Sequence, residues 1–186
     1  MMSMQLITEP VIEPVTLDEA KLFLRIDTPD DDVLLASLIT ASRRLIEQAT
    51  RNCLLQQTWR FGFDVWPSSL MLRLPLAPLL SLSAVTVMDG AGNRMAQNLA
   101  NFQINPTSMP PTVQSKSMPP ISAASEGGIQ LAAVFGYGTT ATSVPQALRV
   151  SVLMVLSQFY ETRGLGDSTL PASVRTLIAP FTRRAL

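Results

Sequence analysis

Histidine is absent from this 186-residue sequence, and cysteine occurs once, as Cys53. Histidine is the most common general base and a common zinc ligand, so its absence argues against most hydrolytic and metal-dependent chemistry. A single cysteine excludes a disulfide within the chain and gives no sign of an oxidising compartment. Because no histidine is present to activate it, we interpret Cys53 as a structural thiol. We therefore expect no enzymatic activity and no cofactor.

Long apolar runs are also missing. The best candidate, residues 150–156, is flanked by Arg149 and Gln158 and falls short of the roughly 18 residues of a membrane span. The first ten residues lack the basic start and apolar run of a signal peptide. We therefore expect a protein that is made in the cytosol and does not bind membranes.

The chain has no net charge, because 14 Lys and Arg balance 14 Asp and Glu. Non-specific DNA binding depends on excess positive charge, so a dedicated DNA-binding protein is disfavoured. The charges are segregated, however. Residues 1–32 carry most of the acids, and the rest of the chain is basic. This segregation suits copies that stack acidic end against basic end, although two solvated faces explain it equally well.

Two helices are predicted within residues 16–52. Thr16 and Glu19 have the spacing of a capping box, which starts a helix that runs to about residue 25. Asp30, Asp31 and Asp32 precede a second helix, where the positive end of the helix dipole favours carboxylates. We expect Asn52 to end this helix in a left-handed conformation. Apolar residues recur at helical spacing along the second helix, and Arg43, Arg44, Glu47 and Arg51 fall on its wetter side. The predicted apolar side comprises Leu34, Leu38, Ala41 and Leu45, with Leu35, Ile39, Ile46 and Ala49 alongside.

A β-rich insertion is predicted at residues 55–138, where apolar residues alternate with polar ones. We expect strands at 59–65 and 70–74, paired as a hairpin, and further strands at 84–88, 102–104 and 129–135. Residues 105–128 are rich in proline, serine and methionine, and we interpret them as a long mobile loop. Two more helices are predicted within 144–179, the first ending at Gly164, followed by an arm at 180–186. The prediction is a single α+β domain: about four helices with an antiparallel insertion between the second and third.

Residues that could bind partners are more evident than residues that could do chemistry. Arginine supplies most of the basic residues, and its guanidinium group is favoured in ion pairs across interfaces. Trp66, before Pro67, is as well explained by a contact between subunits as by a place in the core. The run of three aspartates lacks the alternating spacing of a calcium loop, so we interpret it as a helix start. Candidate contacts between subunits are Asp30, Asp31, Asp32, Arg43, Arg44 and Trp66.

The C-terminal arm is a second candidate binding segment. We expect Pro180 to end the last helix, so that the residues after it leave the bundle. Apolar anchors and guanidinium groups together bind well in a groove between subunits. A frayed basic tail is the competing explanation. The candidate anchors for a portal are Phe181, Arg183, Arg184 and Leu186.

Three segments resemble head-tail connector proteins of long-tailed phages and gene transfer agents. They are Val15 to Asp27 (VTLDEAKLFLRID), Asp31 to Ser42 (DDVLLASLITAS) and Leu170 to Phe181 (LPASVRTLIAPF), with Val144 to Arg149 and Phe159 to Arg163 in the expected order between them. The middle, 55–143, matches only as a Leu-Pro strand and an Asp-Gly turn. The 105–128 loop has no counterpart.

This resemblance implies a structural, non-enzymatic virion protein. It would form a ring of about a dozen copies that docks beneath the portal protein, meets stopper or tail-completion proteins, and lets DNA pass through its lumen without sequence-specific binding. Two alternatives stay open: a stopper or tail-completion protein, and a small nucleic-acid-binding packaging factor. Clustering of basic residues on one helix would favour the latter, and Arg43, Arg44 and Arg51 come closest.

Overall fold

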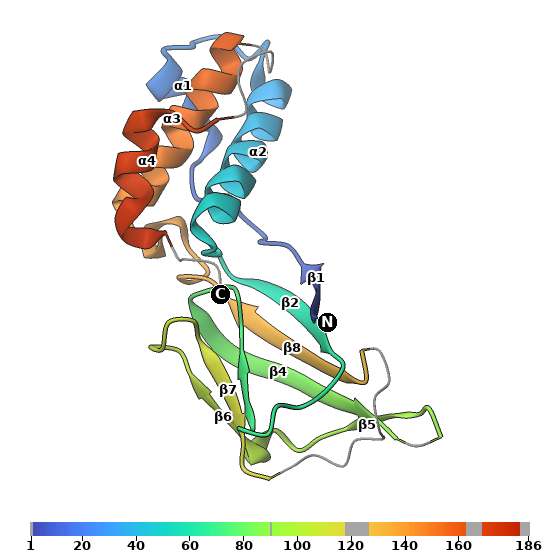
Figure 1. Cartoon of the computed structure of the whole chain (residues 1–186). Helices are drawn as coiled ribbons and strands as arrows, with labels where there is room; N and C mark the ends of the chain where they lie inside the picture. The colour runs from blue at the N-terminus through green and yellow to red at the C-terminus, as the bar shows by residue number, and fades with distance from the viewer. Residues whose placement is uncertain (1, 90, 118–126, 163–168, 183–186) are drawn as a thin grey trace. The chain divides into compact units, whose positions relative to one another are not determined.

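The computed structural model describes residues 2–89, 91–117, 127–162 and 169–182. The single domain expected from the chain length is divided into two compact units (Figure 1). Of the described residues, the helical unit comprises 10–55, 137–162 and 169–182, and the β unit comprises 2–9, 56–89, 91–117 and 127–136. The predicted fold class is confirmed: the chain is α+β, and antiparallel strands are inserted between its second and third helices.

Four α-helices build the described part of the helical unit. They are α1 (Leu17–Leu24), α2 (Asp32–Thr50), α3 (Gln146–Thr162) and α4 (Ala172–Ile178), with 3-10 turns at Ala141–Ser143 and Ala179–Phe181. The α3 helix contacts each of the other three helices. The predicted stop at Gly164 lies outside the described residues.

The predicted capping box is present at the start of α1. The Thr16 hydroxyl oxygen accepts a hydrogen bond from the backbone N–H of Glu19 at 3.1 Å, and the Thr16 N–H donates to the Glu19 carboxylate at 2.9 Å. The prediction for the end of α2 was wrong by one residue. Arg51 adopts the left-handed conformation with φ 57°, and Asn52 is buried. The Asn52 side-chain amide instead donates to the carbonyl of Phe181 at 2.6 Å, which ties the end of α2 to the C-terminal turn.

The helical core selects part of the predicted apolar side of α2. Leu35, Ile39 and Ile46 are buried in the helical core, whereas Leu34 remains 47% exposed and Ala41 is also exposed. Two apolar stripes run along this helix side by side, and periodicity alone does not say which one meets the core. The core is completed chiefly by Leu148, Val152, Val155 and Leu156 of α3 and Val174 and Ile178 of α4.

The β unit contains two antiparallel sheets. The larger has the order β1-β2-β8-β4-β5, and the smaller has the order β3-β7-β6. The strands are β1 (Met2–Thr8), β2 (Gln57–Phe63), β3 (Met71–Arg73), β4 (Leu79–Met88), β5 (Arg94–Ala96), β6 (Phe102–Asn105), β7 (Thr112–Ser115) and β8 (Ile129–Phe135), with a 3-10 turn at Leu99–Asn101.

Three features of the β unit correct the predictions. The hairpin of 59–65 with 70–74 does not form, because β2 pairs with β1 and β8, and β3 pairs with β7. Strand β1 was not predicted. The presumed loop at 105–128 contains β7, where Val113 is fully buried, so this part is ordered within the domain. Residues 118–126 of that loop lie outside the described residues.

Candidate functional site

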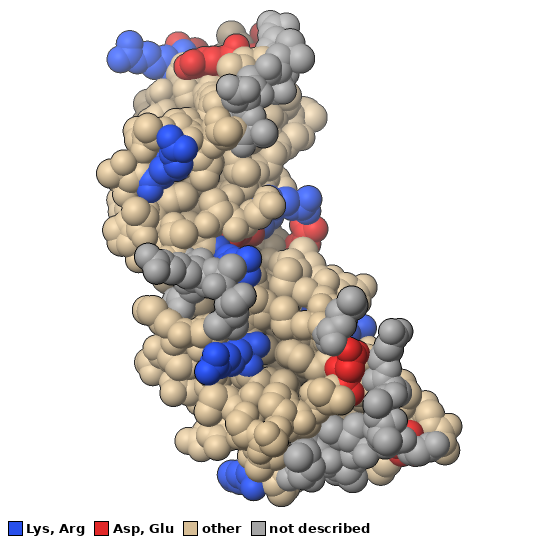
Figure 2. Space-filling view, in the orientation of Figure 1, with Lys and Arg blue, Asp and Glu red and all other residues tan. Residues whose placement is uncertain are grey.

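The surface offers contact areas, with few groups suited to chemistry. In Figure 2 the visible part of the helical unit is mostly uncharged, with acidic and basic side chains gathered near its upper end. Among the described residues, no group of three His, Cys, Asp or Glu side chains is placed to hold a metal ion. No helix in the described ranges is long and apolar enough to cross a membrane. The candidate site is therefore the set of residues predicted to bind partners.

The three aspartates before α2 are largely used within the helical unit. Asp31 accepts a hydrogen bond from the hydroxyl of Tyr160 at 2.6 Å, and Asp32 forms an ion pair with Lys21 at 2.7 Å. These contacts join the start of α2 to α3 and α1. Asp30 is the one of the three aspartates that is exposed, so it is the best placed to contact another subunit. That Asp30 contacts another subunit stays a prediction.

Arg43 was predicted on the wet side of α2, and this prediction was wrong. Its side chain is only 3% exposed and bridges two carboxylates: Nε lies 2.7 Å from Glu13 Oε2, and Nη1 lies 2.9 Å from Glu47 Oε2. Burial by itself lowers the pKa of Arg43, but hydrogen bonds and charges from Glu13 and Glu47 outweigh it and raise the pKa. Arg43 is therefore an internal anchor that ties the segment before α1 to α2.

The Arg43 contacts bear on the nucleic-acid alternative. That alternative required Arg43, Arg44 and Arg51 to form a basic face on one helix. Arg44 is exposed, but Arg43 is buried between carboxylates and Arg51 forms the end of α2. The basic face is thus interrupted at its centre, and the remaining guanidinium groups do not form a continuous surface for phosphates.

A second internal ion pair was missed by the sequence analysis. Arg149 of α3 lies 2.5 Å from the Glu19 carboxylate and donates from Nε to the carbonyl of Pro14 at 2.8 Å. The hydrogen bond from the Thr16 backbone, together with Arg149, outweighs desolvation and lowers the pKa of Glu19. Arg149 lies 130 residues from Glu19 in the sequence, so no local signal indicated the pair.

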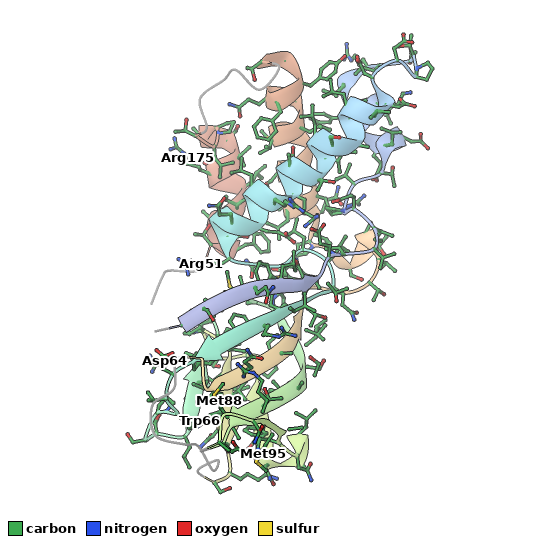
Figure 3. The ribbon with its side chains drawn as sticks, turned by 90° about the vertical axis from the view of Figure 1, so that its right-hand side faces the viewer. Arg51, Asp64, Trp66, Met88, Met95 and Arg175 are labelled. Atoms are coloured by element: carbon green, nitrogen blue, oxygen red, sulfur yellow. The ribbon has the colours of Figure 1, made fainter. Side chains whose placement is uncertain are left out.

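Trp66 belongs to the core of the β unit (Figure 3). It is 6% exposed, and its ring lies 5.7 Å from the ring of Phe102 at an angle of 48°. Its indole N–H is buried without a hydrogen-bond partner among the described residues. Of the two explanations left open by the sequence, the structure favours the core, and Trp66 is corrected as a candidate contact.

The C-terminal arm begins later than predicted. Beyond Pro180 the chain does not leave the bundle at once, because Ala179–Phe181 forms a 3-10 turn and Phe181 packs against the helical core. Proline is tolerated in the first turn of a helix, where its missing N–H has no partner to lose. Arg183, Arg184 and Leu186 lie outside the described residues. Portal binding by Arg183, Arg184, Leu186 and the partly buried Phe181 stays a prediction.

Comparison with known proteins bears on the resemblance. Residues 14–71 match the model of the phage gp6-like head-tail connector protein family. The resemblance to head-tail connector proteins is confirmed. The matched segment includes α1, α2 and β2, the first strand after α2. No curated protein sequence matches the chain.

Solved structures extend the likeness of the connector fold to nearly the whole chain. A chain in the neck of an empty gene transfer agent particle, computed with C6 symmetry, has a TM-score of 0.83 at 23% identity and covers 99% of this chain and 97% of its own length. A chain in the virion of a native gene transfer agent particle has a TM-score of 0.80 at 22% identity, with coverage of 98% and 96%. A chain in a native neck computed with C12 symmetry has a TM-score of 0.75 at 22% identity, with coverage of 98% and 97%. At these identities the likeness establishes the fold.

Proposed function

We propose that the chain is a structural subunit of the head-tail junction of a tailed phage or gene transfer agent particle. In this role it forms a ring that joins the head to the tail. The ring docks beneath the portal protein, meets stopper or tail-completion proteins on its other side, and surrounds part of the channel through which DNA passes. The function is mechanical, and we assign no catalytic residue to it.

The strongest support for this proposal is the likeness of the fold to solved structures. The fold of both units together, including the insertion and the closing helices, matches chains of gene transfer agent necks over nearly their full length. The family match at residues 14–71 is independent of it and carries the same description, head-tail connector. The symmetry of those necks, C6 and C12, supports assembly of this chain as a ring of repeated copies.

The charge pattern is compatible with a channel protein. A strongly basic lumen would hold DNA through its phosphates and oppose sliding, and this chain has no net charge. In the helical unit, Arg43 and Arg149 are engaged by Glu13, Glu47 and Glu19, so part of its positive charge is neutralised internally. These features support passage of DNA better than retention of it.

Deleting the gene from a particle-producing strain tests the proposal. We expect DNA-filled heads and free tails that are not joined, and restoration of joined particles when the gene is supplied in trans. If the chain were a tail-completion protein, its loss would instead give heads that carry a complete connector and lack only the parts that are added after it. A packaging factor would give empty heads. Normal joined particles without this gene would contradict the proposal.

A further inference from the structure

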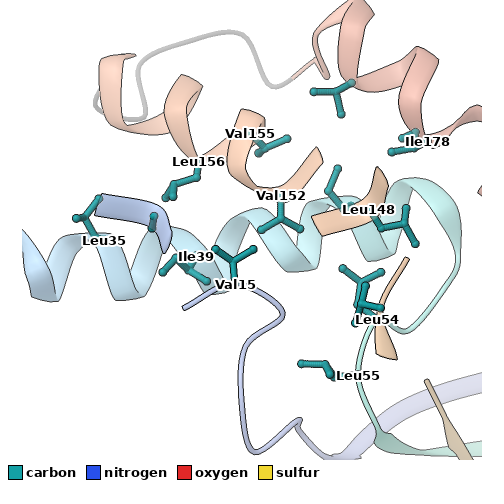
Figure 4. Packing of buried hydrophobic residues seen from close by; sticks show 14 residues of the cluster. Val15, Leu35, Ile39, Leu54, Leu55, Leu148, Val152, Val155, Leu156 and Ile178 are labelled. Atoms are coloured by element: carbon teal, nitrogen blue, oxygen red, sulfur yellow. The ribbon is translucent and has the colours of Figure 1, made fainter. Parts of the chain in front are cut away.

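The outer side of α2 is an apolar surface that the described residues of the helical unit leave exposed. Leu35 and Ile39 lie on the side of α2 toward Val152 and Leu156 of α3 (Figure 4). With 100° per residue, Val33, Leu34, Ser37 and Ala41 project roughly to the opposite side. Val33 is 84% exposed and Leu34 is 47% exposed, and Ser37 and Ala41 are exposed as well. We call these four residues the α2 outer face.

This face is more apolar than its composition suggests. The hydroxyl of Ser37 donates to the carbonyl of Val33 at 3.0 Å, so its proton is already satisfied within the helix. No charged residue occurs between Val33 and Ala41. Removing the α2 outer face from water therefore requires little desolvation of polar groups, because Asp30 and Arg44 lie beyond its two ends. Large exposed apolar residues are typical of protein contacts.

The charges at the border of this face indicate which partner fits. Asp30, just before α2, is exposed and gives the border at the start of the helix negative charge. On α4, Arg175 is exposed beside Ala172 and Thr176, and the hydroxyl of Thr176 donates to the Ala172 carbonyl at 3.0 Å. The exposed side of α4 thus combines the positive charge of Arg175 with an uncharged surface on which the Thr176 hydroxyl already has a hydrogen-bond partner. This combination complements the α2 outer face and its negatively charged border.

The two surfaces lie on different sides of the same unit. In Figure 1, α3 stands between α2 and α4, and α3 packs against both. A surface on one side that is complementary to a surface on the other side produces head-to-tail contacts, which close into a ring when the rotation between copies allows it. A surface complementary to itself would produce a twofold dimer.

We propose that the α2 outer face docks against α4 of a second copy of this chain, with Asp30 facing Arg175 of that copy. This inference rests on the proposed function, because it assigns the contact between neighbouring subunits of the proposed ring. Leu34 and Val33 supply the apolar contact, and the Asp30–Arg175 pair sets the direction in which copies follow one another.

Disulfide cross-linking tests the contact in particles that carry Ser37→Cys, Thr176→Cys or both substitutions. Both positions are exposed, and α3 prevents them from meeting within one chain. The unsubstituted chain is the control, since its only thiol, Cys53, is buried. After mild oxidation, we expect the double variant to give a ladder of covalent oligomers and each single variant to stay monomeric. Dimers from Ser37→Cys alone would reveal a twofold α2 contact and overturn the inference.

A charge substitution provides a second, independent measurement. We expect Leu34→Glu to lower the amount of chain incorporated into particles by about tenfold or more, which corresponds to roughly 1.4 kcal/mol of contact energy. Ala36→Glu adds the same charge to an exposed position on another side of α2 and should leave incorporation within about twofold. Equal incorporation of both variants, or no ladder from necks that contain the double variant, overturns the contact and leaves the proposed function intact. Absence of the unsubstituted chain from necks overturns the proposed function itself.

Discussion

Replacement of Arg43 by alanine probes the main internal anchor of the helical unit. The guanidinium group bridges Glu13 and Glu47, and these carboxylates also accept hydrogen bonds from the Thr40 hydroxyl at 2.8 Å and the Leu54 N–H at 2.7 Å. Removing Arg43 leaves two neighbouring carboxylates without their shared positive charge. The cluster joins the segment before α1, the middle of α2 and the residues after α2, so its loss should loosen all three.

The expected magnitude follows from the exposure of the partners. Removing one member of a buried ion pair costs about 3–5 kcal/mol, because the remaining charge stays buried. The side chains of Glu13 and Glu47 are 27% and 13% exposed, so water compensates part of this loss. We therefore expect the free energy of unfolding to fall by about 2–3 kcal/mol, which lowers the Tm by roughly 5–10 °C for a chain of this size.

Thermal unfolding followed by circular dichroism measures this effect. The matched control is Arg44→Ala, which removes the same side-chain type from the next position of α2, where it is exposed. We expect this control to change the free energy of unfolding by no more than about 0.5 kcal/mol. If Arg43→Ala and Arg44→Ala melt together, the buried ion-pair cluster does not stabilise the helical unit and our description of it is wrong.

Four further outcomes are expected. The pKa of Glu19 is lowered from 4.5 in the folded chain, so its contribution to stability is present above about pH 4.5 and is lost as the pH falls through the lowered value. In denaturant unfolding across this pH range, Glu19→Gln should therefore lose less free energy of unfolding than the unsubstituted chain. Leu35→Ala should destabilise by about 2–5 kcal/mol and Leu34→Ala by less than about 1 kcal/mol in denaturant titrations, since only Leu35 is fully buried; equal losses would place the wrong side of α2 in the core. Deleting residues 183–186 should leave the Tm unchanged, whereas deleting 181–186 should lower it, because Phe181 packs against the core; equal melting curves would show that Phe181 contributes nothing. The isolated chain should be monomeric or weakly associated at micromolar concentration, as expected for copies that assemble on a portal; a stable ring in light scattering without other proteins would contradict this.

Local signals in the sequence predicted the starts of helices well. The Thr16 capping box, the helix after Pro145 and the helix after Pro171 depend on residues within one turn of the boundary, and all three are present. The alternation around Phe61 and around Leu131 likewise gave β2 and β8, because an alternating pattern is a local property of a half-buried strand. Element type was therefore accessible wherever neighbours in the sequence determine it.

Contacts between distant residues explain the failures. Arg43 was expected in water because its partner Glu13 lies 30 residues earlier, and an arginine without a known partner is best placed outside. Strands β1 and β7 are short or exposed, and their pairing with β2 and β3 is set by the tertiary fold. On α2, two apolar stripes compete, and only the position of α3 selects Leu35 over Leu34. The place of Trp66 was left open for the same reason, because its ring packs against Phe102, which is distant in the sequence.

Imaging of particles that carry a labelled chain tests the central claim most directly. Ala91 is exposed between β4 and β5, which makes it a suitable position for a small inserted tag. A gold-labelled ligand for this tag should mark the junction of head and tail, in several copies arranged as a ring around the channel axis. The assignment would be contradicted by label on the head surface or along the tail. Joined particles that contain every other neck protein but carry no label would contradict it as well.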